Sequence, residues 1–287
     1  MADRRLMHAP GAELRLRVLS TTILAPVALV AAIAGSLPFG MLVALVAAIA
    51  FREWSVMTEA AEPVWASMAA LIALAVGLLA LAAGSRGWAL GAIGVTVLLT
   101  LAAGLRSRAF RWMGFGLLYV AIPSAGLIVL RQSEPSGWAA LLFVLFIVWA
   151  TDIAAYFGGR GLGGPKLWPR VSPKKTWSGA LTGLAAALCA GGLTAGLTGA
   201  GDWRLGVLIA APLSIASQIG DLFESALKRR FGVKDSGHVI PGHGGVLDRL
   251  DGLFAAAALA LLIAATGLGG SILTISPADA AQIGAAL

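Results

Sequence analysis

Most of this 287-residue chain consists of apolar runs that are about as long as a membrane-crossing helix. The hydrocarbon core of a bilayer is ~30 Å thick and takes about 20 residues of helix, with a working range of ~17–25. Ala and Leu dominate the runs, and the residue alternation typical of strands is missing. We therefore predict an all-α, polytopic integral membrane protein with about nine transmembrane helices: Val18–Gly35, Leu37–Phe51, Pro63–Gly84, Gly87–Leu105, Ala109–Leu130, Ser136–Gly158, Gly179–Gly199, Leu205–Leu222 and Leu250–Gly269.

Charged residues are too scarce for a water-soluble fold. They make up 12% of the chain, and 59% of the residues are hydrophobic, whereas soluble domains carry about 25% charged residues. A disordered chain is also excluded, because disorder requires low hydrophobicity and high net charge. The single cysteine, Cys189, lies inside an apolar run, so the sequence contains neither a disulfide framework nor a cysteine pair for zinc.

The basic residues fall on alternate sides of the predicted spans. Of the 21 Lys and Arg residues, 18 lie in the N-terminal segment and in every second connecting segment. Because short cytoplasmic loops are rich in Lys and Arg, we expect a cytoplasmic N-terminus and a C-terminus on the opposite side. Topology and attraction to anionic lipid headgroups account for the formal charge of +7. We therefore expect no binding to nucleic acid.

The spans and loops divide the chain into three regions. The N-terminus also resembles a signal peptide, with a cleavage site at Ala32 to Ala34. Its apolar stretch is longer than the usual core of ~7–15 residues, which favours an uncleaved first helix. The predicted regions are a cytoplasmic N-terminal segment (1–17), transmembrane helices one to five (18–135), and a C-terminal catalytic region (136–287) that contains helices six to nine and cytoplasmic loops 159–178 and 223–249.

The first of these two loops follows an acidic residue inside an apolar helix. Asp152 lies one to two turns before the cytoplasmic end of its span. A carboxylate at such a position costs at least ~2.5 kcal/mol on insertion scales, so it indicates a functional site. The alternative is a structural ion pair with Arg160. The glycines at 159, 161 and 164 match a dinucleotide fingerprint in spacing, but that motif must follow a strand, and these glycines follow a membrane helix.

The second loop is flanked by further carboxylates. Glu224, Ser225 and Lys228 follow Asp221 by three, four and seven residues, so on a helix the four side chains share one face. A face with acidic, hydroxyl and ammonium groups suits a metal-bound phosphate. Asp248 and Asp251 similarly share the start of the last predicted helix.

Between these carboxylates lies the turn Pro241-Gly-His-Gly-Gly245. Its glycines allow backbone amides to approach an anion closely. Carboxylate oxygens beside such a turn favour Mg²⁺, which takes one or two protein carboxylates and completes its shell with phosphate and water. Zinc is disfavoured, because His243 has no second His or Cys at a suitable spacing. The residues together indicate a phosphotransfer site at the cytoplasmic membrane boundary.

The stretch from Ser225 to Asp251 resembles the signature of the phosphatidate cytidylyltransferase (CDP-diacylglycerol synthase) family. The family pattern is Ser-x-apolar-Lys-Arg, four residues, Lys-Asp-x-small, then Pro-Gly-His-Gly-Gly-apolar-x-Asp-Arg-apolar-Asp, and every fixed position is met. The segments 152–160 and 172–176 also look like a conserved block of the family. The resemblance covers roughly the C-terminal half of the chain. One departure is Ser178, where many members carry a Glu.

The resemblance implies that CTP, or dCTP, reacts with phosphatidate to give CDP-diacylglycerol and pyrophosphate in phospholipid biosynthesis. It implies Mg²⁺ as the cofactor, K⁺ as a second cation and a homodimer. It also places the protein in the cell's inner membrane, in contact with membrane lipids and with the active site facing the cytoplasm.

The resemblance also assigns residue roles. Asp221 and Asp248 match the metal-binding acids, and Asp152 is a further ligand or a supporting acid. The catalytic residues that it implies are Asp221, Asp248, Lys228 and Lys234, of which the lysines stabilise the departing pyrophosphate. The substrate-binding residues that it implies are Ser172, Lys175, Thr176, Ser225, His243, Gly244, Gly245 and Arg249.

Two other functions fit parts of the sequence. A CTP-dependent lipid or polyprenol kinase would need a similar site, although the full match at Pro241 to Asp251 argues against it. An ion-coupled transporter would also have intramembrane acids. Against a transporter, the polar residues gather at one face of the membrane, and the sequence has no inverted repeat.

Overall fold

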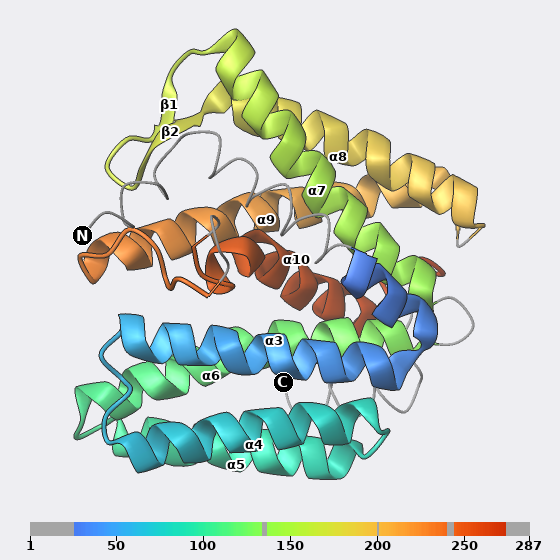
Figure 1. The fold of residues 1–287 in the computed structure, drawn as a ribbon. Coiled ribbons are helices and arrows are strands. Elements are labelled where there is room, and N and C mark those ends of the chain that lie inside the picture. Colours follow the sequence, from blue (N-terminus) through green and yellow to red (C-terminus); the bar gives the residue numbers. More distant parts are fainter. Residues whose placement is uncertain (1–25, 134–136, 200, 240–243, 274–287) are drawn as a thin grey trace, which may run out of the picture.

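The computed structural model describes residues 26–133, 137–199, 201–239 and 244–273. These residues are mostly helical (Figure 1), and residues 26–34 form the first described helical stretch. The elements that follow are α3 (Ser36–Met57), α4 (Val64–Ala82), α5 (Arg86–Ala103), α6 (Arg108–Gln132), α7 (Gly137–Leu162), β1 (Lys166–Trp168), β2 (Ser172–Thr176), α8 (Trp177–Thr198), α9 (Trp203–Arg230) and α10 (Leu247–Ala265).

Seven helices in the described ranges, α3 to α9, are long and apolar enough to cross a membrane. They correspond to the second through eighth predicted spans, so the protein is an integral membrane protein. The predicted total of nine is not reproduced. The first predicted span begins at residue 18, outside the described residues, and α10 is absent from the seven, since Asp248, Arg249 and Asp251 occupy its first turns.

The expectation of an all-α chain is wrong in the loop predicted at 159–178. Here β1 and β2 pair antiparallel, with Lys166 opposite Thr176. Pro165, Pro169 and Pro173 lie in this segment, and each lacks the backbone N–H that a helix interior uses, which favours an extended backbone here. The irregular part is also shorter than predicted, because α7 continues to Leu162 and α8 already begins at Trp177.

The predicted loop 223–249 begins too early. Helix α9 continues to Arg230, because the polar residues after Leu222 are compatible with a helix and are stabilised there. Nζ of Lys228 lies 2.7 Å from the Glu224 carboxylate one turn earlier, and such pairs support a helix. The three basic residues of the last turn also lie at the negative end of the helix dipole, where positive charge stabilises a helix.

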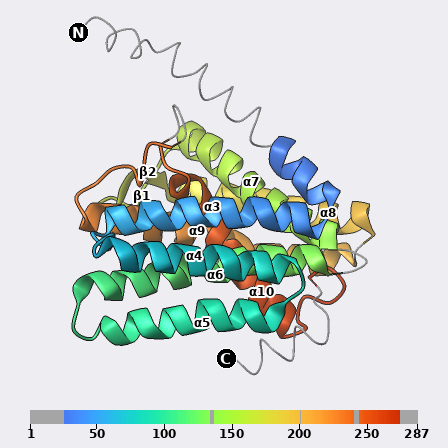
Figure 2. The same cartoon turned by 60° about the horizontal axis from the view of Figure 1, so that its bottom comes forward.

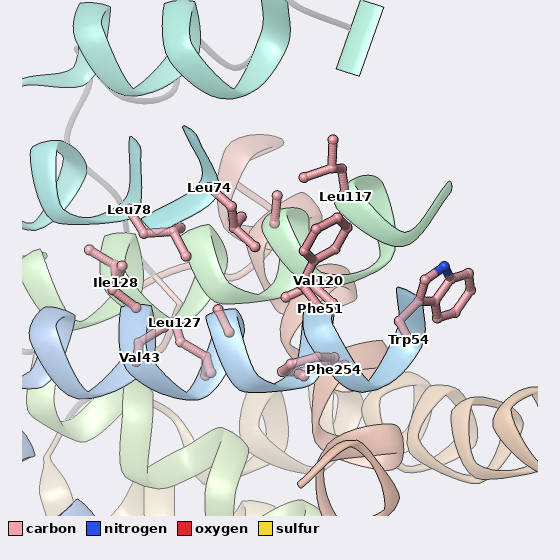
Figure 3. Close-up of a cluster of buried hydrophobic side chains, with 14 of the residues drawn as sticks. Val43, Phe51, Trp54, Leu74, Leu78, Leu117, Val120, Leu127, Ile128 and Phe254 are labelled. Carbon is pink, nitrogen blue, oxygen red and sulfur yellow. The ribbon is translucent and has the colours of Figure 1, made fainter. Parts of the chain in front are cut away.

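Helix α10 lies between two groups of helices (Figure 1), α3–α6 on one side and α7–α9 on the other. Side chains from α3, α4, α6 and α10, including Phe51, Leu74, Leu117 and Phe254, meet in one buried cluster (Figure 3). A second cluster joins α7, α8, α9 and α10. In Figure 1 α4 and α5 lie at the edge away from α8, and in Figure 2 α5 lies along the lower edge. Helix α10 therefore packs against both groups of helices.

Helices α9 and α10 approach each other closely at Gly220, next to the acidic residues of α9. A Cβ atom at this position would lie 2.5 Å from the backbone oxygen of Asp251 and 2.6 Å from Cβ of Ala255. A glycine is therefore required for the two helices to sit at this separation, and the residue that follows it is Asp221.

We predict that Gly220→Ala destabilises the protein by ~1–3 kcal/mol, the usual cost of overpacking a core. Thermal unfolding of the purified protein in detergent measures the effect. The matched control is Gly94→Ala in α5, where an added Cβ meets no atom within 4 Å. Equal melting temperatures for the two variants would contradict the close approach of α9 and α10.

Candidate active site

A cavity of about 340 Å³ gathers acidic residues from three helices and a connecting segment. Asp152 comes from α7, Asp221 from α9, and Asp248 from the first turn of α10. The other lining residues are Lys228, Asp235, Arg249 and Asp251. Five carboxylates face one space with few cations among them, so the cavity suits a positively charged ligand.

Lys228 and backbone amides hold the Asp248 carboxylate in place. Lys228 donates a hydrogen bond of 2.8 Å to Oδ1 of Asp248. The backbone N–H groups of Ser236 and Gly245 donate to Oδ2 over 2.9 and 2.8 Å. Burial would raise the pKa of the Asp248 carboxyl, but the hydrogen bonds from Lys228, Gly245 and Ser236 outweigh burial and lower the pKa. Asp248 is therefore ionised at neutral pH.

The turn before α10 depends on glycine. Gly244 has φ of 84°, a left-handed conformation that side chains rarely adopt. A Cβ atom there would also lie 3.0 Å from Oδ2 of Asp248. The turn can therefore pass close to the carboxylate, and the next residue, Gly245, donates its N–H to it.

A second cavity, of about 580 Å³, adjoins the first and has the opposite charge character. The two cavities share Asp152 and Asp221 as lining residues. An ion pair between Lys175 of β2 and Asp221 of α9 lies at this junction. The basic residues of the second cavity are Arg160, Lys166, Lys174 and Lys175. This cavity suits an anion, next to a cavity that suits a cation.

Thr176, the last residue of the hairpin, also caps the start of α8. Oγ1 of Thr176 accepts a hydrogen bond of 3.1 Å from the N–H of Gly179 and begins α8. Ser178, which stands where many family members have Glu, lies 3.0 Å from the Thr176 hydroxyl and donates to the backbone oxygen of Gly163. In this chain, residue 178 ties the end of α7 to the start of α8.

The structure brings most of the predicted site residues together. Ser225 donates to Asp221 over 3.5 Å, as their spacing on one helix face predicts. Ser172 and Lys234 do not line either cavity, and Lys234 is exposed. His243 lies outside the described residues. Those placed around the cavities or in the turn beside them are Asp152, Asp221, Lys228, Asp248, Arg249, Lys175, Thr176, Gly244 and Gly245.

Sequence reasoning missed Glu53, at the far end of α3. Its side chain is 4% exposed and accepts hydrogen bonds from the N–H groups of Val246 and Leu247 over 3.0 and 2.8 Å. Oε2, which accepts from Leu247, also accepts a hydrogen bond of 3.4 Å from the Ser236 hydroxyl. Glu53 therefore holds the turn that carries Gly245 and Asp248. Glu53, like Asp152, is a carboxylate at the end of an apolar span, and this position is the sequence signal that could have identified it.

We predict that Glu53→Gln destabilises the protein by ~1–3 kcal/mol. The amide NH₂ would face a backbone N–H donor, which leaves a buried donor without an acceptor. Thermal unfolding in detergent is compared with that of Glu59→Gln, whose side chain is exposed near the same end of α3. If both variants unfold at the wild-type temperature, the Glu53 carboxylate does not anchor the turn.

The carboxylates of the acidic cavity fit a divalent cation whose coordination shell is completed by oxygens of a bound ligand. Among the described residues, no group of three or more acidic, His or Cys side chains is arranged to hold a metal ion by itself. Mg²⁺ does not need such a group, because it usually takes one or two carboxylates together with phosphate and water. Asp152, Asp221 and Asp248 line the acidic cavity, so their carboxylates could supply the one or two oxygen ligands that this mode needs.

The fold and cavities define a membrane protein with a charged site assembled by its C-terminal helices. Residues 15–266 match the model of the cytidylyltransferase family. The match spans most of the chain, and the protein belongs to this family.

Individual relatives match over a shorter segment. A phosphatidate cytidylyltransferase of Brucella suis is 58% identical over 155 residues, which cover 54% of this chain and 57% of that protein. The protein of that name from Rickettsia bellii is 41% identical over 52% of this chain and 67% of its own length. The one from Staphylococcus saprophyticus is 42% identical over 48% and 53%. The matched segment thus spans little more than half of the Brucella relative.

Proposed function

We propose that this protein transfers the cytidylyl group of CTP, or dCTP, to phosphatidate and releases pyrophosphate. The observation that carries the proposal is the junction of an acidic and a basic cavity at Asp152 and Asp221. A nucleoside triphosphate with its cation and a lipid phosphate need such neighbouring environments. The similarity to proteins named phosphatidate cytidylyltransferase supports the same reaction.

The chemistry requires charge compensation more than proton transfer. An oxygen of the lipid phosphate attacks the α-phosphorus of CTP, and the bond from that phosphorus to the bridging oxygen of the β-phosphate breaks. The electron pair of that bond leaves with pyrophosphate. The attacking phosphate is already an anion near neutral pH, so the protein must align two anions and stabilise the departing one.

Lys175 and Lys228 can provide this stabilisation. Each contacts an aspartate that faces the cavities, Asp221 for Lys175 and Asp248 for Lys228. Their ammonium groups therefore lie where phosphate oxygens would enter. Ammonium groups in a partly buried site stabilise developing negative charge more strongly than they do in water.

We further propose Mg²⁺, held by Asp221 and Asp248 with Asp152 nearby. When bound, the cation would neutralise phosphate charge and orient the triphosphate. K⁺ as a second cation stays a prediction of the family resemblance, as does a homodimer.

The site is proposed to face the cytoplasm of the cell, from the inner membrane. The basic residues that flank it, in the hairpin and at the end of α9, lie in the segments richest in Lys and Arg. This bias supports a cytoplasmic site, a cytoplasmic N-terminus and a C-terminus on the opposite side.

Isotope labelling tests the reaction. Purified protein with phosphatidate, Mg²⁺ and CTP labelled at the α-phosphate is expected to produce labelled lipid, because the α-phosphorus stays with the product. CTP labelled at the γ-phosphate should leave the lipid unlabelled. Lipid labelled by the γ-phosphate instead would identify a kinase, and label confined to soluble nucleotide in both cases would reject both functions.

We predict that Asp221→Asn and Asp248→Asn each reduce cytidylyl transfer by at least ~100-fold, because each removes a negatively charged ligand of the cation that would stabilise the reacting phosphates. Initial rates are measured at several Mg²⁺ concentrations. Asp202→Asn is the matched control, since Asp202 caps the opposite end of α9. Near-normal rates for either site variant, in protein that melts like the wild type, would remove that aspartate from the metal site.

A further inference from the structure

A groove lies on the other side of α9 from the acidic cavity. Its volume is about 680 Å³, and its walls come from the ends of α3 and α6 and from α9. The aromatic residues are Trp54, Trp112, Phe115, Tyr119 and Phe223. The α9 residues that line it are 223, 226, 227 and 230, whereas the acidic cavity uses 221 and 228. The groove and the charged site therefore use different faces of one helix.

Three arginines surround one end of this groove. A neighbouring cavity of about 520 Å³ shares Trp112, Phe115 and Arg230 with it and adds Arg108 and Arg111. Within the described ranges, none of the ion pairs involves these arginines. Arg230 instead lies over the Trp112 ring at 5.4 Å, and Arg108 lies over the Phe231 ring at 5.8 Å. Three positive charges that form no ion pair with a carboxylate of the described residues thus border an aromatic groove.

The groove is open to the surroundings of the protein. Ring contacts join α6 to α9 and to the residue that follows it. The ring centroids of Tyr119 in α6 and Phe223 in α9 are 5.5 Å apart, and those of Trp112 in α6 and Phe231 after α9 are 5.0 Å apart. Phe115 and Phe223 are each 46% exposed. In a membrane-spanning bundle, exposed rings of this kind face lipid. Arginines next to Trp at the end of spanning helices lie at the depth of the lipid headgroups.

We propose that this groove binds an anionic phospholipid of the surrounding bilayer, separately from the lipid that reacts. The headgroup phosphate would lie among Arg108, Arg111 and Arg230, whose guanidinium groups bind phosphate through paired hydrogen bonds. An acyl chain would lie along Trp112, Phe115 and Phe223. A phosphate held by these arginines is on the far side of α9 from Asp221, so it is not placed to react. The inference does not rest on the proposed enzymatic activity.

Charge complementarity identifies the occupant. An apolar groove alone would suit any lipid tail, and arginines alone would suit any anion. The combination at one membrane boundary requires a ligand with a negative head and a long apolar tail. A neutral phospholipid lacks the net charge, and inorganic phosphate lacks the tail.

The test measures phosphatidylglycerol binding to the purified protein in a neutral detergent by native mass spectrometry, without nucleotide. The variant Arg111→Gln/Arg230→Gln removes two groove arginines. The control Arg106→Gln/Arg229→Gln removes two exposed arginines close in sequence to the groove arginines, one just before α6 and one in the last turn of α9, and neither lines the groove. Thermal unfolding verifies that all the proteins are folded.

We expect the groove variant to bind phosphatidylglycerol at least tenfold more weakly and the control to stay within about twofold of the wild type. Phosphatidylcholine and millimolar inorganic phosphate should not compete. Equal weakening of both variants would show general attraction between cytoplasmic arginines and lipid, and would overturn the proposal. Unchanged binding in the groove variant, or displacement by inorganic phosphate, would overturn it as well.

Discussion

The charged site depends on the junction of α9 and α10, which the ion pair between Lys228 and Asp248 holds together. Lys228 lies 2.7 Å from Glu224 and 2.8 Å from Asp248, so one ammonium group joins α9 to the first turn of α10. Removing either partner would leave a charge in a poorly solvated place, which is far costlier than losing an exposed pair. Gly220 permits the same two helices to approach closely. Charge pairing and close packing therefore act at the same junction.

Glu53 extends this junction to the other half of the molecule. Its carboxylate crosses from α3 to the backbone of Val246 and Leu247, and the same turn contributes the Gly245 N–H to Asp248. Helix α10 also packs against α3 and α6 through Phe254. The first helices therefore do more than anchor the chain in the membrane, because they determine where the Asp248 carboxylate lies.

Sequence periodicity and local spacing predicted what local interactions determine. The apolar runs located α3 to α9, and the spacing of Asp221, Ser225 and Lys228 correctly placed them on one helix face. The contact of Glu53 with Leu247 spans 194 positions, and no local pattern encodes such a separation. The β-hairpin was missed because hydropathy distinguishes apolar from polar segments but does not report the pairing of Lys166 with Thr176. Lys234 belongs to the motif, yet it is exposed and lines neither cavity, since adjacency in sequence does not fix where a side chain lies.

Helix α9 contributes residues to both the charged site and the aromatic groove. Asp221 and Lys228 face the acidic cavity, while Phe223 and Arg230 face the groove. Because these residues lie on one continuous hydrogen-bonded helix, a rotation of its C-terminal turns that repositions Arg230 also moves Lys228 relative to Asp248. The Lys228 ion pairs resist such a rotation, and so does the close contact at Gly220. The contacts that hold the charged site therefore also fix the position of the helix that carries Arg230 at the edge of the groove.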